Sequence, residues 1–95
     1  MIKSFADATT SDIFHGLNTK EARKIPVNLH GIVRRKLDML NAAMSLDDLR
    51  SPGNHLEKLT GKYSGFWSIR VNDQYRIIFQ WANGDAHAVK CFDYH

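Results

Sequence analysis

The chain has 95 residues, of which 43% are hydrophobic and 11% aromatic, and a formal net charge of +3. This length allows one domain, residues 1–95, with a small hydrophobic core. The single cysteine, Cys91, excludes an internal disulfide framework and a cysteine-rich zinc site, and it agrees with a cytoplasmic location. No apolar run approaches the roughly 18 residues of a membrane span, and the N-terminal residues lack the apolar centre of a signal peptide.

Positive charge is concentrated in one segment of the chain. Between residues 20 and 36 the only acid is Glu21. The basic residues there are Lys20, Arg23, Lys24, Arg34, Arg35 and Lys36. Such a concentration can steer a protein to a polyanion, or it can be the solvated face of a helix. Charge alone leaves both interpretations open.

The first half of the chain predicts helices after a short N-terminal strand over residues 1–5. Residues 6–18 are ambiguous, and Thr10 or Ser11 could cap a short helix there. The stretch 26–44 is the strongest helix prediction, because its apolar residues recur at spacings of three and four. That stripe consists of Leu29, Val33, Leu37, Leu40 and Met44.

The signals that bound this helix are also local. Pro26 suits a first helical turn, where no N–H is needed. Ser45 and Asp48 have the spacing of a capping box, which predicts a short helical turn. The sequence SPGN at 51–54 then favours a chain reversal.

Beyond residue 54 the apolar period changes from near four to two. A strand is expected around residues 55–59, and Asn83-Gly84 is a strong signal for a tight hairpin. The clearest strands are GFWSIRV, YRIIFQW and AHAVKCF, at 65–71, 75–81 and 86–92. The sequence therefore predicts an α+β domain, with the N-terminal strand and two or three helices packed on a C-terminal antiparallel meander.

Strand alternation assigns the side chains to two faces. The natural core face of the strand expected at 75–81 consists of Tyr75, Ile77, Phe79 and Trp81. Arg76 then projects from the opposite face, where an unpaired, half-buried guanidinium would be costly. We therefore expect Arg76 either to form a cross-strand ion pair or to have a functional role.

The last predicted strand ends in Asp93, Tyr94 and His95. Simple alternation places His87, Val89, Cys91, Asp93 and His95 on one face of this strand. Continued pairing would bring the C-terminal residues towards one concave surface. The residues expected there are Glu57, Lys58 or Lys62, Arg76, Tyr94 and His95.

The motifs of serine hydrolases, phosphate-binding loops and HExxH metalloenzymes are absent from the sequence. The histidines are scattered, so no metal and no cofactor are expected. An acid, a cation and an imidazole without a metal fit RNA cleavage by the 2′-hydroxyl, which needs a base, an acid and a cation near the phosphate. Glu57, His95 and Arg76 could fill these roles in that order, although most small proteins contain these residue types.

The order of these motifs is more specific than the residue types. The segments LEKLTG, SGFWSIRV, YRIIF and DYH, together with the N-terminal MIKSF, resemble the RelE/ParE toxin superfamily, in particular its HigB and YoeB branches. The resemblance covers nearly the whole chain. It implies a compact cytoplasmic toxin that cleaves mRNA in the ribosomal A site without a metal and is neutralised by an antitoxin.

The resemblance also implies roles for individual residues. Arg76 matches the arginine placed against the scissile phosphate, and His95 matches the histidine assigned as general acid. Glu57 matches the general base of YoeB-like toxins. Asp93 could orient His95, and Tyr94 could stack on a base.

The sequence departs from the family pattern near Glu57. Some HigB toxins carry a histidine at that place and a nearby basic residue where this chain has Thr60. Lys58 and Lys62 are candidates to replace that cation. His55, two positions before Glu57, would share its strand face and is a reserve candidate for the base.

The leading hypothesis is a ribosome-dependent mRNA endoribonuclease, in which the basic segment and Lys58 and Lys62 contact RNA or the ribosome. The expected partners are a helix-turn-helix antitoxin of the HigA type, the 30S A site and mRNA, with operator DNA bound only through the antitoxin. Two alternatives share the fold: a ParE-like inhibitor of DNA gyrase, and an inactive module that only binds the antitoxin.

Overall fold

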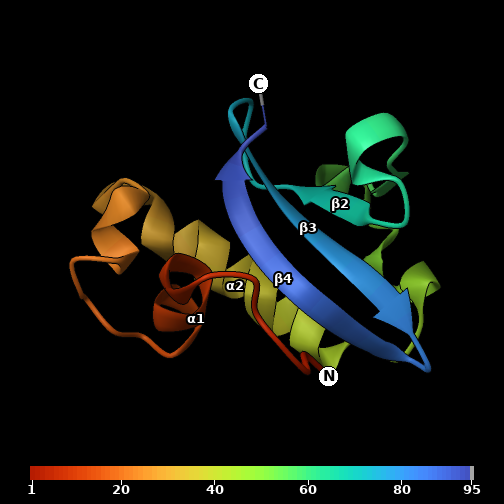
Figure 1. Cartoon of the computed structure of the whole chain (residues 1–95), viewed down its shortest axis with the longest axis horizontal. Coiled ribbons are helices and arrows are strands. Elements are labelled where there is room, and N and C mark those ends of the chain that lie inside the picture. The colour runs from red at the N-terminus through yellow and green to blue at the C-terminus, as the bar shows by residue number, and fades with distance from the viewer. Residues whose placement is uncertain (95) are drawn as a thin grey trace.

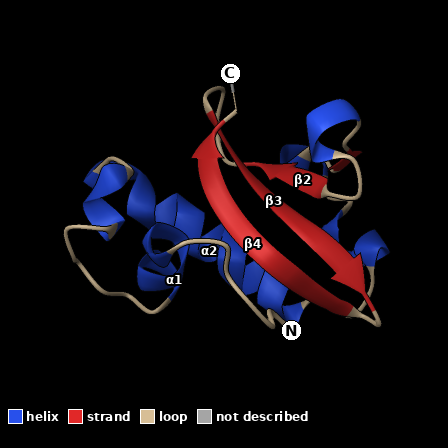
Figure 2. Cartoon of the chain, viewed as in Figure 1, coloured by secondary structure: helices blue, strands red, loops and turns tan. Residues whose placement is uncertain are grey.

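The computed structural model describes residues 1–94 (Figure 1). Two α-helices, α1 (Ala8–Phe14) and α2 (His30–Ala42), pack on one face of a four-stranded antiparallel sheet (Figure 2). The strands neighbour one another in chain order: β1 (Glu57–Lys58), β2 (Trp67–Arg70), β3 (Tyr75–Ala82) and β4 (Asp85–Asp93). Short 3₁₀ turns connect these elements: η1 (Ala22–Lys24), η2 (Val27–Leu29), η3 (Leu46–Leu49), η4 (Pro52–Asn54) and η5 (Gly61–Tyr63). The predicted α+β class with its antiparallel meander is confirmed.

Helix α1 begins earlier than the sequence pattern suggested. Its N-cap is Asp7, whose side chain accepts a hydrogen bond from the backbone N–H of Thr10 at 2.9 Å. An aspartate in this place satisfies one of the N–H groups that a helix start leaves unpaired. The prediction that Thr10 or Ser11 caps the helix is therefore wrong. Thr10 instead lies inside the helix and is fully buried.

Helix α2 confirms the core of the predicted apolar stripe and corrects its ends. Val33, Leu37 and Leu40 are fully buried. Leu29 lies in η2 before the helix, and Met44 lies beyond its end with 84% of its surface exposed. The stripe stops at Leu40 because the chain turns away after Ala42, so periodicity no longer governs burial.

The predicted N-terminal strand is reduced to two isolated parallel bridges. Ile2 pairs with Ala86 and Phe5 pairs with Val89, both in β4. The N–H of Lys3 donates to the carbonyl oxygen of Ala86 at 2.8 Å. The first residues thus run along the outer edge of β4 without forming a regular strand, and they cover part of an edge that would otherwise be open.

The β3–β4 hairpin contains one confirmed prediction and one correction. Asn83 and Gly84 both have positive φ, 55° and 78°, as the tight turn requires. In β4, Ala88 also has a positive φ of 52°, and the register shifts there, so that β4 contains one extra residue opposite β3. This is a β-bulge.

The bulge changes which residues share a face. Ala86 and Val89 are both fully buried in the core, whereas His87 pairs with Gln80 on the other face. The expectation that His87 and Val89 share a face is therefore wrong. From Val89 to Asp93 the chain again alternates, since Cys91 pairs with Ile77 in the core.

The main core lies between the helices and one sheet face, and the other face is open only in part, since Ser68 and Ile78 on it are buried. The core's buried sheet residues include Ile69, Ile77, Phe79 and Cys91, and the helices contribute Ile13, Val33, Leu37 and Leu40. The opposite face carries the cross-strand row Glu57, Ser68, Ile78 and Lys90, next to the row Arg70, Arg76 and Phe92. The side chains of Ser68, Arg70, Arg76 and Gln80 in the central strands β2 and β3 all lie on this partly open face, the open face.

A buried hydrogen bond between α1 and β4 gives a stability prediction. The N–H of Cys91 donates to Thr10 Oγ1 at 2.9 Å. Thr10→Val keeps the side-chain shape and leaves this N–H unpaired, so we expect a loss of about 1–3 kcal/mol in the free energy of unfolding by urea. Thr10→Ser keeps the acceptor and should lose less. A valine variant at least as stable as the serine variant would contradict this role.

The buried cysteine gives a second prediction. Burial, together with the nearby Asp7 carboxylate, raises the pKa of the Cys91 thiol from 9.0 to about 12. Because the folded pKa lies above the unfolded value, the thiol form favours folding below pH 9 and loses that effect as the pH rises towards 12. At pH about 8 the folded protein should not react with Ellman's reagent, whereas the urea-unfolded protein should. Rapid reaction in the folded state would contradict this.

Candidate active site

The side chain of Arg76 is the centre of the open face. In β3 it lies between its cross-strand partners Arg70 and Phe92. Its Nε donates to Ser68 Oγ at 3.0 Å, and its Nη2 donates to the carbonyl oxygen of His55 at 2.9 Å. Only 17% of the side chain is exposed. These two bonds, from Nε and Nη2, fix the plane of the guanidinium, and within residues 1–94 no hydrogen bond is made by its Nη1.

Glu57 lies beside this guanidinium. It pairs with Ser68 across β1 and β2, which places its side chain on the same face as Arg76. Glu57 Oε1 is 3.7 Å from Arg76 Nη2, and 57% of the Glu57 side chain is exposed. An ion pair this exposed contributes about 0–1 kcal/mol. The structure thus places Glu57 and Arg76 side by side, and the Glu57 carboxylate stays accessible to solvent.

His55 does not share a strand face with Glu57, contrary to expectation. Strand β1 contains only Glu57 and Lys58, and His55 precedes it as the C-cap of η4 with a left-handed backbone, φ 44°. This conformation directs the His55 carbonyl to Arg76. The residue therefore contributes to the site through its backbone.

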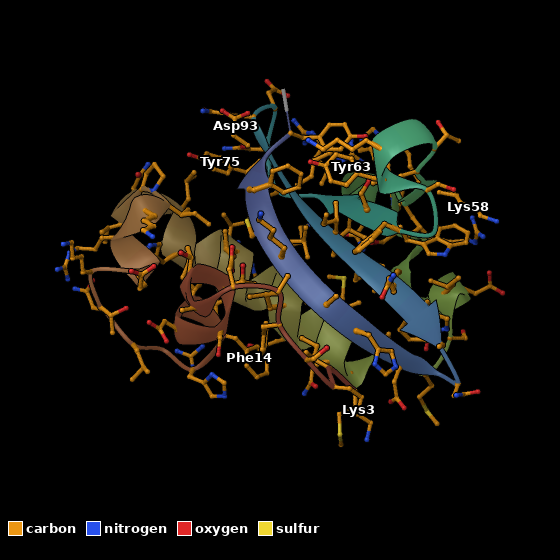
Figure 3. The ribbon with its side chains drawn as sticks, viewed as in Figure 1. Lys3, Phe14, Lys58, Tyr63, Tyr75 and Asp93 are labelled. Carbon is orange, nitrogen blue, oxygen red and sulfur yellow. The ribbon has the colours of Figure 1, made fainter. Side chains whose placement is uncertain are left out.

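One aromatic ring adjoins the guanidinium, and two further rings pack around that ring. The ring of Tyr94 has its centroid 5.9 Å from Arg76 Cζ. It also lies 5.9 Å from the ring of Tyr63 and 5.9 Å from that of Phe92. Figure 3 shows Tyr63 at the end of the sheet where Asp93 and Tyr75 also lie. Tyr94, with 38% of its surface exposed, presents part of its ring to solvent beside the arginine.

Asp93 is held by the turn between β2 and β3. It pairs with Tyr75 across β3 and β4, and its Oδ2 accepts from Gln74 Nε2 at 3.0 Å. The backbone N–H of Tyr94 donates to the carbonyl oxygen of Gln74 at 3.2 Å. These bonds fix the C-terminal strand up to Tyr94. His95 lies outside the described residues, so its assignment as general acid stays a prediction.

A polar hollow of about 170 Å³ opens beside Arg76. At about 30 Å³ per liquid water molecule, it has room for several waters or for one compact polar group. Its lining residues are Arg70, Asn72, Asp73, Gln74, Arg76 and Tyr94.

The structure divides the basic segment between two places. Lys24 forms an ion pair with Glu21 at 2.7 Å, and its hydrogen bond to this carboxylate raises the pKa of Lys24. Arg34 lines a separate hollow next to Gly16, away from Arg76. Lys20 and Arg23 are the other basic residues in this part of the segment. Arg23 Nη1 donates a hydrogen bond to the carbonyl oxygen of Asn18. These residues do not adjoin the guanidinium of Arg76.

Lys36 behaves differently, because its Nζ bonds to Asn54, the residue before His55. Arg35, its neighbour in α2, is exposed. Lys58 lies over the Trp67 ring at 6.0 Å, and Lys62 lies over the Tyr63 ring at 5.5 Å. Of the predicted RNA contacts, Lys36 and Lys62 therefore contact residues next to the site, and Lys58 follows Glu57 directly in β1.

Sequence reasoning did not find Ser68, Arg70 or the carbonyl of His55. Strand pairing could have revealed the first two, because Arg70 pairs with Arg76, and Ser68 shares their face two residues earlier. The carbonyl of His55 has no side-chain signature, so no sequence motif could have marked it.

Two kinds of structural feature are absent from residues 1–94. These residues contain no group of three His, Cys, Asp or Glu side chains placed to hold a metal ion. Within the same range no helix has both the length and the apolar character needed to cross a bilayer.

Comparison with known proteins agrees with this fold and motif order. Residues 3–95 match the family described as the RelE-like toxin of type II toxin-antitoxin system HigB. The chain is 32% identical over 95 residues to the Endoribonuclease HigB of Proteus vulgaris, covering 100% of both chains. It is 50% identical over 68 residues to Toxin HigB-1 of Vibrio cholerae serotype O1, covering 70% of this chain and 72% of the relative.

Solved structures show the same fold at low sequence identity. The YoeB–YefM complex from Staphylococcus aureus aligns with a TM-score of 0.61 and 13% identity, over 100% of this chain and 98% of the matched chain. A YoeB/ParE toxin from Agrobacterium tumefaciens gives 0.56 and 14%, over 99% and 100%.

The architecture, two helices on a four-stranded antiparallel sheet, is that of the RelE-like toxins. Within that class, the chain belongs to the HigB family of type II toxin–antitoxin systems.

The bond from Arg76 to Ser68 can be tested directly. The Arg76 Nε–H should exchange with water more slowly than those of exposed arginines, because it is bonded to a buried hydroxyl. Ser68→Ala should accelerate this exchange, measured by NMR on the arginine side-chain resonances. Ser64→Ala, at an exposed serine in the loop after η5, is the control. Equal exchange in the two variants would show that Ser68 does not hold Arg76.

Proposed function

We propose that this protein is a toxin that cleaves mRNA in the ribosomal A site, without a metal, and so inhibits translation. The observation that carries the proposal is the fixed guanidinium of Arg76 beside the carboxylate of Glu57 on an open sheet face. The full-length relative named Endoribonuclease HigB supports RNA cleavage as the reaction class.

The reaction joins the ribose 2′-oxygen to the phosphorus and breaks the bond from phosphorus to the 5′-oxygen of the next nucleotide. Glu57 takes the 2′-proton as general base, and His95 gives a proton to the leaving 5′-oxygen. Arg76 binds the non-bridging oxygens, where negative charge increases in the transition state. The products are a 2′,3′-cyclic phosphate and a 5′-hydroxyl. No redox partner or co-substrate is required.

Geometry favours Glu57 over His55 as the base. The Glu57 carboxylate lies 3.7 Å from the guanidinium that would hold the phosphate, and it is exposed enough to meet a 2′-hydroxyl. His55 approaches Arg76 with its carbonyl, in a left-handed conformation. Tyr94 supplies an exposed ring beside the phosphate site, where a neighbouring base can stack.

We further propose that a HigA-type helix-turn-helix antitoxin neutralises the toxin, and that operator DNA is bound only through it. The aligned YoeB structure from Staphylococcus aureus is itself a complex with YefM. A gyrase inhibitor and an inactive antitoxin-binding module remain the alternatives. The arginine–glutamate pair favours the nuclease over both.

The proposal predicts A-site cleavage that depends on Arg76. Purified protein is added to a translating-ribosome reaction, and mRNA 5′ ends are mapped by primer extension. The wild type should cut within the A-site codon. Arg76→Ala should lower the cleavage rate by about 10²–10³-fold, and Glu57→Gln by about 10²–10⁴-fold. A chain lacking His95 should also lose cleavage.

Two variants serve as matched controls. Arg50→Ala removes an exposed arginine that pairs with Asp47, so cleavage should be unchanged. His55→Gln keeps the backbone carbonyl and should retain most activity, whereas a loss equal to that of Glu57→Gln would make His55 a rival base. Intact mRNA on active ribosomes would refute the nuclease, and supercoiling by gyrase would then be assayed.

A further inference from the structure

Lys36 reaches from α2 to the turn that precedes β1. Its Nζ donates to Asn54 Oδ1 at 2.6 Å. Asn54 is fully buried, and its amide nitrogen donates to the carbonyl oxygen of Leu49 at 3.0 Å and contacts the sulfur of Met39 at 3.1 Å. The ammonium group of Lys36 is therefore held by a fixed support, unlike a lysine free in solvent.

The same turn joins Lys36 to the candidate active site. Asn54 bonds to Lys36, and the next residue, His55, accepts a hydrogen bond from Arg76. Two consecutive residues thus hold two cations that come from different layers of the fold, α2 and β3. Arg70, the cross-strand partner of Arg76, adds a third cation and lines the same hollow as Arg76.

Lys36 and Arg70 repel each other, and the positive charge of this group is only partly neutralised. Burial, followed by the charges of Arg35 and Arg70, lowers the pKa of Lys36. Arg70 pairs with Asp73, whose side chain is 99% exposed. Within residues 1–94 Lys36 forms no ion pair, since its partner is the neutral amide of Asn54. A cluster of held cations of this kind is stabilised by an anion.

We propose that Lys36 and Arg70 continue the phosphate site of Arg76 into a track for the RNA backbone. This inference rests on the proposed function: Arg76 holds the scissile phosphate, and the other two cations hold phosphates next to it in the strand. Asn54 is the positioning residue, because it fixes Lys36 Nζ beside the turn that carries His55. The strand leaves the active site towards η4 and α2.

The opposite direction, past Tyr63 and Phe92, offers cations of a different kind. Lys62 lies over the ring of Tyr63 at 5.5 Å, and Lys90 lies over that of Phe92 at 5.3 Å. Within residues 1–94 neither ammonium has a hydrogen-bonded support of the kind that Asn54 gives Lys36. The aromatic rings there are suited to stacking on bases, whereas the hydrogen-bonded cations are suited to binding phosphates.

The test measures binding of a fully 2′-O-methylated RNA hexanucleotide, which has no 2′-hydroxyl and cannot be cleaved. Fluorescence anisotropy gives its affinity for the full chain over a series of NaCl concentrations. Each lost phosphate contact should reduce the steepness of log K against log salt by about 0.7. Lys36→Met and Arg70→Met should each show this reduction and bind more weakly at low salt.

Matched variants separate a lost contact from a lost fold. Lys36→Arg keeps the charge and should retain the wild-type slope. Lys3→Met removes an exposed lysine at the opposite end of the molecule from Asp93 and Tyr63 (Figure 3), so the slope should not change. Circular dichroism establishes that each variant is folded before its binding is measured.

The outcomes distinguish this track from the nuclease proposal. A slope reduced in Lys36→Met but not in Lys3→Met supports the track, even if no mRNA is cut on the ribosome. Equal slopes for the wild type and folded Lys36→Met would overturn the track while leaving cleavage by Arg76 intact. Failure of the wild type to bind the hexanucleotide at low salt would also overturn it.

Discussion

The position of Arg76 on a central strand is the constraint on which the rest of the site depends. A guanidinium that is mostly shielded from water must be hydrogen-bonded or it destabilises the fold. Here the bonds come from Ser68 in the adjacent strand and from the carbonyl of His55 beyond it. The second bond requires η4 to end in a left-handed residue, and the buried Asn54 holds that turn in place.

The division of the sheet into two faces makes this arrangement rigid. One face is closed by α1 and α2 over a continuous apolar core, so the strands cannot shift against each other without disturbing it. The other face is supported by the same strands, and there Glu57 is exposed and Arg76 is partly exposed. The phosphate-binding role proposed for Arg76 needs a fixed guanidinium, because electrostatic stabilisation works best when the charge is already in place.

The parts of the structure that could be predicted depend on local signals. Asn83-Gly84 forms the tight turn that the dipeptide predicted. Strand alternation correctly placed Arg76 on the face opposite to the buried Ile77 and Phe79. Met44 was misassigned because periodicity continued in the sequence after the chain had left the helix. The N-cap of α1 is Asp7, although Thr10 or Ser11 was expected. The sequence did not distinguish these residues, because each side chain can accept a hydrogen bond from an N–H group in the first turn of a helix.

The parts that could not be predicted depend on distant partners. An alanine gives no sign that it will adopt the positive φ of a bulge, and the N–H of Ala88 bonds to Ser4 Oγ at 2.9 Å, far away in the chain. The carbonyl of His55 and the side chain of Asn54 likewise acquire their roles from β3 and α2. A motif identifies the residue types at such a site but not the backbone atoms that orient them.

The pairing of the first residues with β4 has a consequence for biosynthesis. Residues 1–6 leave the ribosome before any of β4, yet their hydrogen bonds are made to Ala86 and Val89. Arg76 likewise lacks one neighbouring strand until β4 has been translated. The four-stranded sheet therefore cannot be completed before β4 has been synthesised and can reach β3.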